Sequence, residues 1–308
     1  MQTVLSPEQC KGLNCFDACL INHVNSRYHE YACAFSNGYY FVFHPQIDNN
    51  QTHIGLSLHQ SKKNTIHNKC HKYYGTYAQK TENDSPLETL NELTAKKQDT
   101  LIVISAFWCP WSTDYQKNDI DHAVIIRNQM EGIILCADPM LTGKIHELPI
   151  DHFIKGCKSI YKLHTKKQRV PYELAWKDFI LYMKSIHVEQ ALTDFFDTLE
   201  ALQDIAAEFP NNEISLLDRA LSYYLPGSRQ MLHYFLQHIN NKLNREIHEQ
   251  ILEISSTLAQ DWEMLRALIL HAHYKKSYSA TKYSILRLGE SIMERETKLV
   301  NYFQNQRI

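Results

Sequence analysis

Long apolar runs, excess charge and a flexible composition are all missing from this sequence. The longest apolar stretches are short, such as residues 101–104, and fall far below the roughly 20 residues that a membrane-spanning helix needs. Lys and Arg number 32 against 34 Asp and Glu, so no global field attracts nucleic acid or an anionic membrane. With only 9 Gly and 9 Pro in 308 residues, collagen-like and linker-type chains are excluded. We expect a globular protein that binds neither nucleic acid nor membranes.

Paired cysteine motifs are also absent. All eight Cys fall within the first 157 residues, and none forms a CxxC pair. The first residues contain neither a basic segment nor an apolar one, so we expect no secretory signal. The spacing of Cys10, Cys15 and Cys19 matches no common zinc finger, and the 17 His are scattered along the chain. We therefore expect reduced thiols in a cytoplasmic protein without a metal site.

Hydrophobic periodicity in the first half is that of a mixed α and β domain. Residues 15–24 predict a helix with Asn14 as its N-cap. Residues 86–97 predict an amphipathic helix, and the aromatic run that follows Gly38, residues 39–43, predicts a strand. Further apolar runs predict three buried strands of one sheet, at residues 101–107, 123–126 and 132–136.

The second half has a helical period instead. Apolar residues recur at helical spacing in three stripes, over residues 192–205, 247–268 and 285–303. Pro210 and the pair Pro226 and Gly227 predict breaks between helices. The polar segment 164–169 separates the two patterns. We expect an α+β domain over residues 1–165 followed by an all-helical domain over residues 166–308.

Four side chains of the first half suit nucleophilic chemistry: Gln9, Cys15, His122 and Asp138. Cys15 begins a predicted helix, where unpaired N–H groups and the helix dipole stabilise a thiolate. His122 opens one predicted strand and Asp138 closes the next, so a turn near residues 128–132 would place the two side by side. A carboxylate that orients an imidazole, which in turn deprotonates a thiol, is a catalytic triad.

Two neighbours of Cys15 bear on this interpretation. Gln9 lies six residues earlier, close enough for its amide to donate to an oxyanion beside the Cys15 backbone N–H. Cys19 follows one helical turn later and is a rival nucleophile, but at that depth it points into the core. Taken singly, each candidate also fits a structural role, as core packing, a surface His or a turn. Their order and spacing together favour the catalytic interpretation.

The same order of residues resembles known families. Gln-x5-Cys, a His that starts a strand and Asp-Pro sixteen residues after that His form the pattern of the bacteriocin-processing double-glycine peptidases, which have a papain-like fold. The sequence is more similar to the butirosin biosynthesis protein H family, in which Leu and Asn follow the Cys as Leu20 and Asn22 do here. The resemblance covers residues 9–160 and includes Glu30 and the segments 38–41 and 107–122. It departs from the family patterns at Asn14, where His is frequent, and at Phe16, where the peptidases have Gly.

This resemblance implies a papain-like cysteine acyltransferase. Such an enzyme takes an acyl group from the phosphopantetheine thioester of an acyl carrier protein, or from coenzyme A, and passes it to an amine-bearing small molecule. The resemblance places that reaction in specialised-metabolite biosynthesis, such as antibiotic assembly. It implies Cys15, His122 and Asp138 as the triad, and it implies no bound cofactor.

Several interpretations stay open at this point. Trp108, Trp111 and Tyr115 are expected to line an acyl or pantetheine channel, although packing between domains explains three aromatics equally well. Basic residues would suit an acidic carrier protein, although such runs are usually solvated: Lys62, Lys63, Lys69, Lys72, Lys166, Lys167 and Arg169. The alternatives to acyl transfer are a cysteine peptidase or thioesterase, in which water replaces the amine, and a catalytically inactive module that binds carrier proteins.

Overall fold

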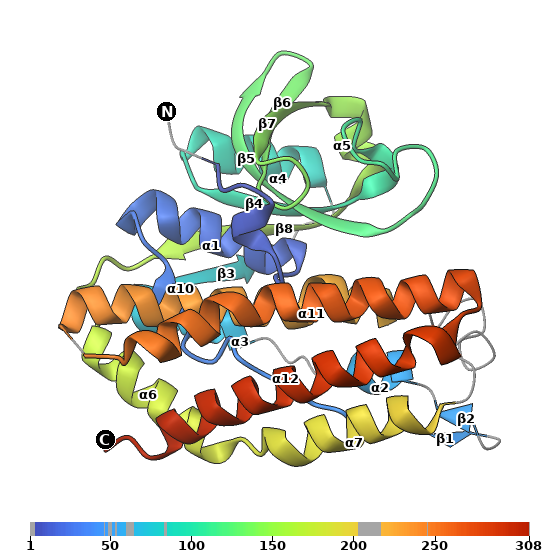
Figure 1. The fold of residues 1–308 in the computed structure, drawn as a ribbon. Helices are drawn as coiled ribbons and strands as arrows, with labels where there is room; N and C mark the ends of the chain where they lie inside the picture. The colour runs from blue at the N-terminus through green and yellow to red at the C-terminus, as the bar shows by residue number, and fades with distance from the viewer. Residues whose placement is uncertain are drawn as a thin grey trace. The chain divides into compact units, whose positions relative to one another are not determined.

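The structure is a computed structural model that describes residues 4–45, 47–48, 51–52, 54–59, 65–82, 85–202, 217–244 and 246–307. It is a mixed α+β protein with a six-stranded antiparallel sheet and several helices (Figure 1). The chain forms two compact units. The sheet unit comprises Met1–Ala34 and Ile66–Val170, and the helical unit comprises Phe35–Thr65 and Pro171–Ile308. The division expected at residue 165 places the segment Phe35–Thr65 in the first domain, whereas in the structure this segment belongs to the helical unit.

The sheet unit is built on strands in the order β3-β8-β4-β5-β6-β7, with every neighbouring pair antiparallel. Their bounds are β3 (Thr76–Lys80), β4 (Thr100–Ser105), β5 (Asp121–Met130), β6 (Ile133–Asp138), β7 (Lys144–Pro149) and β8 (Cys157–Thr165). The three strands predicted from apolar runs are confirmed as the central strands β4, β5 and β6. The edge strands β3 and β7 were not predicted, because an edge strand buries few side chains and its sequence is therefore largely polar.

Helices cover this sheet. The elements are the α-helices α1 (Cys15–Tyr28), α3 (Thr65–Tyr74), α4 (Pro86–Ala95) and α5 (Ile150–Gly156), and the short 3-10 turns η1 (Glu8–Cys10), η2 (Ala32–Phe35) and η3 (Ala106–Trp108). Helix α1 packs against β5 and β3, and α4 packs against β8. A buried apolar core joins the strands to α4, α5 and the η3 loop: Leu90, Leu93, Ile102, Ile104, Cys109, Val124, Ile134, Cys136, Leu148, Phe153 and Ile160. The predicted helices at residues 15–24 and 86–97 are confirmed as α1 and α4.

The helical unit is dominated by long antiparallel helices. Its elements are β1 (Ile47–Asp48), β2 (Gln51–Thr52), α2 (Ile54–His59), α6 (Tyr172–Ser185), α7 (Val188–Ala201), the π-helical turn η4 (Ala220–Tyr224), α10 (Leu225–Leu243), α11 (Glu249–Lys275) and α12 (Tyr278–Gln304). Helix α11 lies alongside both α10 and α12 (Figure 1). The predicted stripes form the core, with Phe195, Leu258 and Ile285 fully buried. Ile205 and Pro210 lie outside the described residues. No helix in the described parts of the chain is long and apolar enough to cross a membrane.

The break predicted at Pro226 and Gly227 is wrong. Helix continues from η4 directly into α10, and both residues are buried in the first turn of α10. The wider π-turn comes just before them, and it is closed by a bond from the Leu225 N–H to the Ala220 carbonyl. Proline is tolerated in the first turn of a helix, where its missing N–H costs little. The Pro and Gly pair therefore does not end the helix here, because the π-turn before it places the proline in the first turn of α10.

The strand predicted at residues 39–43 is also wrong, because this segment is irregular and belongs to the helical unit. Phe41 packs on Trp262 with ring centroids 5.5 Å apart, and Phe43 packs on Phe195. Its backbone carbonyls accept hydrogen bonds from side chains rather than from a neighbouring strand. Tyr182 Oη donates to the Tyr39 carbonyl (2.6 Å), and Arg229 Nη1 donates to the Tyr40 carbonyl (2.7 Å). Aromatic composition favoured a strand, but partners far along the chain satisfy the backbone here.

Candidate active site

Cys15 is the first residue of α1. Asn14 caps this helix, since its Oδ1 accepts the Asp17 N–H at 2.7 Å while its Nδ2 donates to the Asp17 carboxylate at 2.8 Å. These bonds fix the start of the helix at Cys15. The N–H groups of a first helical turn have no partner within the helix, so they and the helix dipole point positive charge at a group bound there. The side chain of Cys15 is half-buried, as a nucleophile that must meet a substrate requires.

The face of α1 that carries Cys15 lies against β5. Cys19, one turn further along the same face, contacts β5 through its sulfur, which lies 3.4 Å from the Ala123 carbonyl oxygen. Cys15 is therefore directed toward the residues at the start of β5, next to Ala123. His122 is the second residue of that strand, and it lies close enough to Cys15 for the thiol to raise the pKa of its imidazole.

His122 and Asp138 are brought together by the hairpin of β5 and β6. The register pairs Ile125 with Ala137, so its continuation by one residue places Val124 opposite Asp138. His122 is two residues from Val124 and therefore on the same face of the sheet. Its Nε2 lies 2.7 Å from Oδ2 of Asp138, and both side chains are buried. The expected juxtaposition of His122 and Asp138 is confirmed.

The electrostatics of the pair follow from these contacts. Burial lowers the pKa of His122, but hydrogen bonds with Asp138 and Cys15 and the negative charge of both partners outweigh burial and raise it to about 9. Burial raises the pKa of Asp138, but the hydrogen bond and charge of His122, with hydrogen bonds from Leu141 and Trp111, bring it below its ordinary value. The site therefore favours an imidazolium held by a carboxylate. Because Nε2 faces Asp138, Nδ1 is the ring nitrogen left to face the sulfur of Cys15.

The other thiols differ from Cys15 in their surroundings. Burial raises the pKa of all seven, to about 12 for Cys10 and Cys109, to about 11 for Cys157, and further for Cys19, Cys33, Cys70 and Cys136. Only Cys157 shares the half-buried state of Cys15. Cys19, the rival nucleophile, is fully buried, which supports its lower rank.

Trp111 contacts the triad in a way that sequence reasoning missed. Its indole Nε1 donates to Oδ2 of Asp138 at 2.7 Å, the same oxygen that His122 contacts. The other oxygen, Oδ1, accepts the backbone N–H groups of Met140 (3.1 Å) and Leu141 (2.9 Å). The Asp138 carboxylate thus accepts four hydrogen bonds, two on each oxygen. The sequence places Trp111 in a loop that is expected to border the cleft, and no periodic signal in that loop shows where the indole N–H points.

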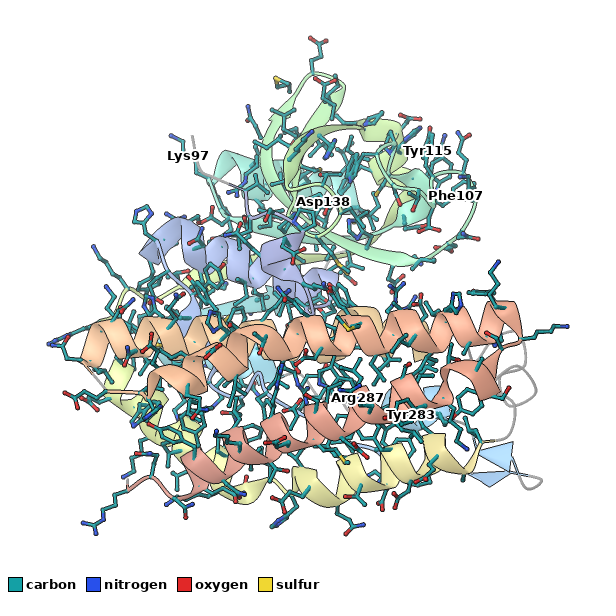
Figure 2. The ribbon with its side chains drawn as sticks, viewed as in Figure 1. Lys97, Phe107, Tyr115, Asp138, Tyr283 and Arg287 are labelled. Atoms are coloured by element: carbon teal, nitrogen blue, oxygen red, sulfur yellow. The ribbon has the colours of Figure 1, made fainter. Side chains whose placement is uncertain are left out.

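Two other predicted substrate residues, Trp108 and Tyr115, lie in the same connection between β4 and β5 and pack on α5. Trp108 packs on His152 (ring centroids 5.4 Å apart) and so closely on Gly156 that a Cβ there would meet its ring at 2.7 Å. Tyr115 also lies beside His152, at 5.8 Å between ring centroids. Figure 2 labels Tyr115 on this loop and Asp138 on the hairpin of the sheet unit. Trp108 and Tyr115 are half-buried, and their assignment to substrate binding stays a prediction.

Gln9 sits on the η1 turn and is exposed. Its Oε1 accepts hydrogen bonds from the backbone N–H (3.0 Å) and the hydroxyl (3.2 Å) of Ser6. These bonds hold the oxygen of the amide, so any donation to an oxyanion would come from its nitrogen. The contribution of Gln9 to an oxyanion hole stays a prediction.

The basic residues are partly described. Lys62 and Lys63 lie outside the described residues. The end of α3 and the segment after β8 are adjacent, because Gln168 Nε2 donates to the Lys72 carbonyl (3.1 Å) and Lys166 N–H to the Gly75 carbonyl (3.0 Å). These two adjacent segments carry the other basic residues: Lys69, Lys72, Lys166, Lys167 and Arg169. Whether a carrier protein docks there stays a prediction.

Within the described residues, no group of three or more His, Cys, Asp or Glu side chains is placed to hold a metal ion. No protein-family model matches the chain, and no curated protein is significantly similar to it. The geometry of Cys15, His122 and Asp138 is therefore the main evidence about function.

Proposed function

We propose that this protein is a cysteine acyltransferase that moves an acyl group from a thioester to an amine. The observation that carries the proposal is the chain of contacts from Cys15 to His122 to Asp138, with the thiol at a helix N-terminus and the imidazole held between thiol and carboxylate. The choice of a thioester donor and an amine acceptor rests on the resemblance to the butirosin biosynthesis protein H family.

The first half-reaction acylates Cys15. The thiolate attacks the thioester carbonyl of an acyl carrier protein or coenzyme A, and the first-turn N–H groups of α1, with Gln9 as a further donor, stabilise the oxyanion. The tetrahedral intermediate expels the pantetheine sulfur, which takes the proton of the His122 imidazolium. The products are an acyl thioester on Cys15 and a free carrier thiol.

The second half-reaction transfers the acyl group. An amine attacks the Cys15 thioester, and neutral His122 takes the proton that the amine loses. Collapse of the intermediate breaks the bond to sulfur, which restores the thiolate and imidazolium and releases an amide. Asp138 orients the imidazole in both steps and stabilises its charged form. A thioester is converted to an amide, so no ATP is required.

The arrangement of the sheet unit supports a papain-like catalytic domain. The nucleophile starts a helix that packs on an antiparallel sheet, and the histidine lies near the start of a strand of that sheet. The carboxylate lies at the end of the neighbouring strand rather than on a separate loop. This is the layout expected from the resemblance to the double-glycine peptidases.

The test uses acyl thioesters of N-acetylcysteamine, which mimic pantetheine, and a panel of primary amines. We expect the full-length chain to gain the mass of one acyl group, mapped to Cys15, and to form an amide when an amine is added. The matched control is Cys157→Ala, which removes the other half-buried thiol and should leave the adduct unchanged.

The products decide between the candidate reactions. Acid rather than amide at every amine concentration would make the protein a thioesterase. Cleavage of a peptide with a double glycine, without acylation by thioesters, would make it a peptidase. Absence of any adduct, together with iodoacetamide labelling of Cys15 no faster than that of the other thiols, would leave only a binding module.

A further inference from the structure

The loop between β4 and β5 places an indole N–H on the carboxylate of the triad. Trp111 Nε1 lies 2.7 Å from Asp138 Oδ2 and the indole is half-buried, whereas Asp138 is fully buried. A buried carboxylate oxygen has two acceptor sites, and here one faces His122 and the other Trp111. The indole therefore limits how Oδ2 can turn relative to the imidazole.

The indole is itself held in place. Its ring is stacked on the imidazole of His146, with centroids 4.7 Å apart and planes 10° apart. His146 lies on β7 directly opposite Cys136, and hence on the face of the sheet that carries Asp138 two residues further along β6. The Nε2 atom of His146 is bonded to Thr142 Oγ1 at 2.6 Å. Thr142, His146 and Trp111 thus form a support that ends on Asp138.

We propose that Trp111 is a positioning residue of the active site, which fixes Oδ2 of Asp138 toward His122 rather than contacting the substrate. This inference rests on the proposed function for its effect on acyl transfer. It replaces the sequence-based assignment of Trp111 to an acyl channel with a role behind the triad. A charge-assisted hydrogen bond is among the stronger contacts in proteins and is directional, as a positioning role requires.

The support acts on a carboxylate with several titratable neighbours. The groups whose charges interact with it come from several elements of the sheet unit: His122, His146, Cys10, Cys19, Cys109 and Cys136. Among them only His122 forms a hydrogen bond to Oδ2. Loss of the Trp111 donor makes the ionised carboxylate less stable, so Asp138 is protonated at a higher pH as the solution is acidified. The imidazolium of His122 then loses its negatively charged partner at that higher pH.

The test compares Trp111→Phe with the wild-type chain, and it includes a chain in which benzothienylalanine replaces Trp111. This sulfur analogue keeps the bicyclic shape and the stack on His146 but lacks the N–H, so it serves where the Phe variant folds poorly. Trp176→Phe, which removes an indole from the helical unit, is the matched control. The rate of Cys15 alkylation by iodoacetamide is measured against pH, and kcat and KM are measured with an acyl N-acetylcysteamine thioester and an amine.

We expect the acid limb of the alkylation profile to move up by about one pH unit in both Trp111 variants and to stay in place in the control. We expect kcat to fall about tenfold while KM for the thioester changes less than about twofold. An unmoved acid limb would overturn the proposal. A raised KM with unchanged kcat would also overturn it, and it would place Trp111 against the substrate. If the wild-type chain forms no amide, the proposed function fails, but the alkylation profile still decides the role of Trp111.

Discussion

Cys15 and Cys19 lie one turn apart on the same face of α1, yet one is half-buried at the helix start and the other is fully buried against β5. Burial raises the pKa of the Cys19 thiol well above its ordinary value, whereas Cys15 lies beside His122 and raises the pKa of that imidazole. The position along the helix, rather than the residue type, therefore decides which thiol can act as a nucleophile.

We expect Cys15→Ala to lose acyl transfer and Cys19→Ala to keep most of it. The loss follows because Cys15 is the thiol that interacts with His122. The retention follows because Cys19 is buried against β5, where its sulfur contacts the Ala123 carbonyl rather than His122. Iodoacetamide should label Cys15 faster than the other thiols at neutral pH, as peptide mapping by mass spectrometry would show. An adduct found on Cys19, or turnover by Cys15→Ala at the wild-type rate, would contradict the assignment.

The raised pKa of His122 predicts a pH dependence of stability. A histidine in an unfolded chain titrates near 6.5, and His122 in the folded protein titrates at about 9. The imidazolium therefore contributes its full stabilisation below pH 6.5, and that contribution is lost as pH rises through about 9. The difference in free energy of unfolding between the wild-type chain and His122→Gln, measured in urea, should therefore be largest near pH 6.

The difference between wild type and His122→Gln should then shrink steadily up to about pH 9. His187→Gln, which changes a histidine of the helical unit, is the control and should give a difference that does not follow this pattern. A wild-type advantage that grows with pH would show that His122 is held neutral, and the ion pair with Asp138 would be wrong.

Local signals explain why the centre of the site could be predicted from sequence. Asn14 before Cys15 is a strong N-cap, and the structure confirms its bond to Asp17. The hairpin was predictable because apolar strands flank a turn at Gly132, whose φ of 76° is one that glycine adopts readily. Since a strand alternates its faces, the ends of the two strands fixed where His122 and Asp138 would meet.

The parts of the site and fold that could not be predicted depend on contacts between residues far apart in the sequence. Trp111 lies in a loop without periodicity, so the direction of its N–H toward Asp138 could not be inferred. The irregular segment that begins at Tyr39 has the composition of a strand, and only Tyr182 and Arg229, more than 140 residues later, give its backbone the partners that make a strand unnecessary. Neither partner has a local signal in the sequence.

The helical unit contains a buried charge pair that should govern its stability. Arg229 and Glu296 are both fully buried, and Arg229 Nε donates to Glu296 Oε1 at 2.7 Å. Glu296 also accepts from Tyr39 Oη (2.6 Å) and Trp262 Nε1 (2.8 Å). Glu296→Gln leaves the arginine charge uncompensated, which typically costs about 3–5 kcal/mol in the free energy of unfolding.

Urea unfolding followed by circular dichroism measures this cost. The matched control is Glu294→Gln, an exposed residue of the same helix, which should change the free energy by less than about 0.5 kcal/mol. Equal effects of the two substitutions would show that the buried pair does not stabilise the unit. Because the assay follows folding alone, its outcome is independent of the proposed chemistry.

Asp138→Asn separates orientation from proton transfer more sharply than removal of the nucleophile does. His122→Ala removes the acid–base group itself, and such a loss typically costs about 10²–10⁴-fold in rate. Asp138 acts only through His122, so Asp138→Asn should retain more acyl transfer than His122→Ala. The four groups around Asp138 are all donors, however, and an asparagine amide offers only one acceptor oxygen to them.

The NH₂ group of that asparagine would face two donors, so we also expect Asp138→Asn to lose about 1–3 kcal/mol of stability. Asp151→Asn, an exposed residue of α5, is the control for both measurements. Rates are compared under conditions in which each variant is folded, as judged by circular dichroism. If Asp138→Asn were as inactive as His122→Ala while folded, the negative charge of the carboxylate, and not only its position, would be required for catalysis. If it were fully active and fully stable, the contact between His122 and Asp138 would have no role in catalysis, and the triad would reduce to Cys15 and His122.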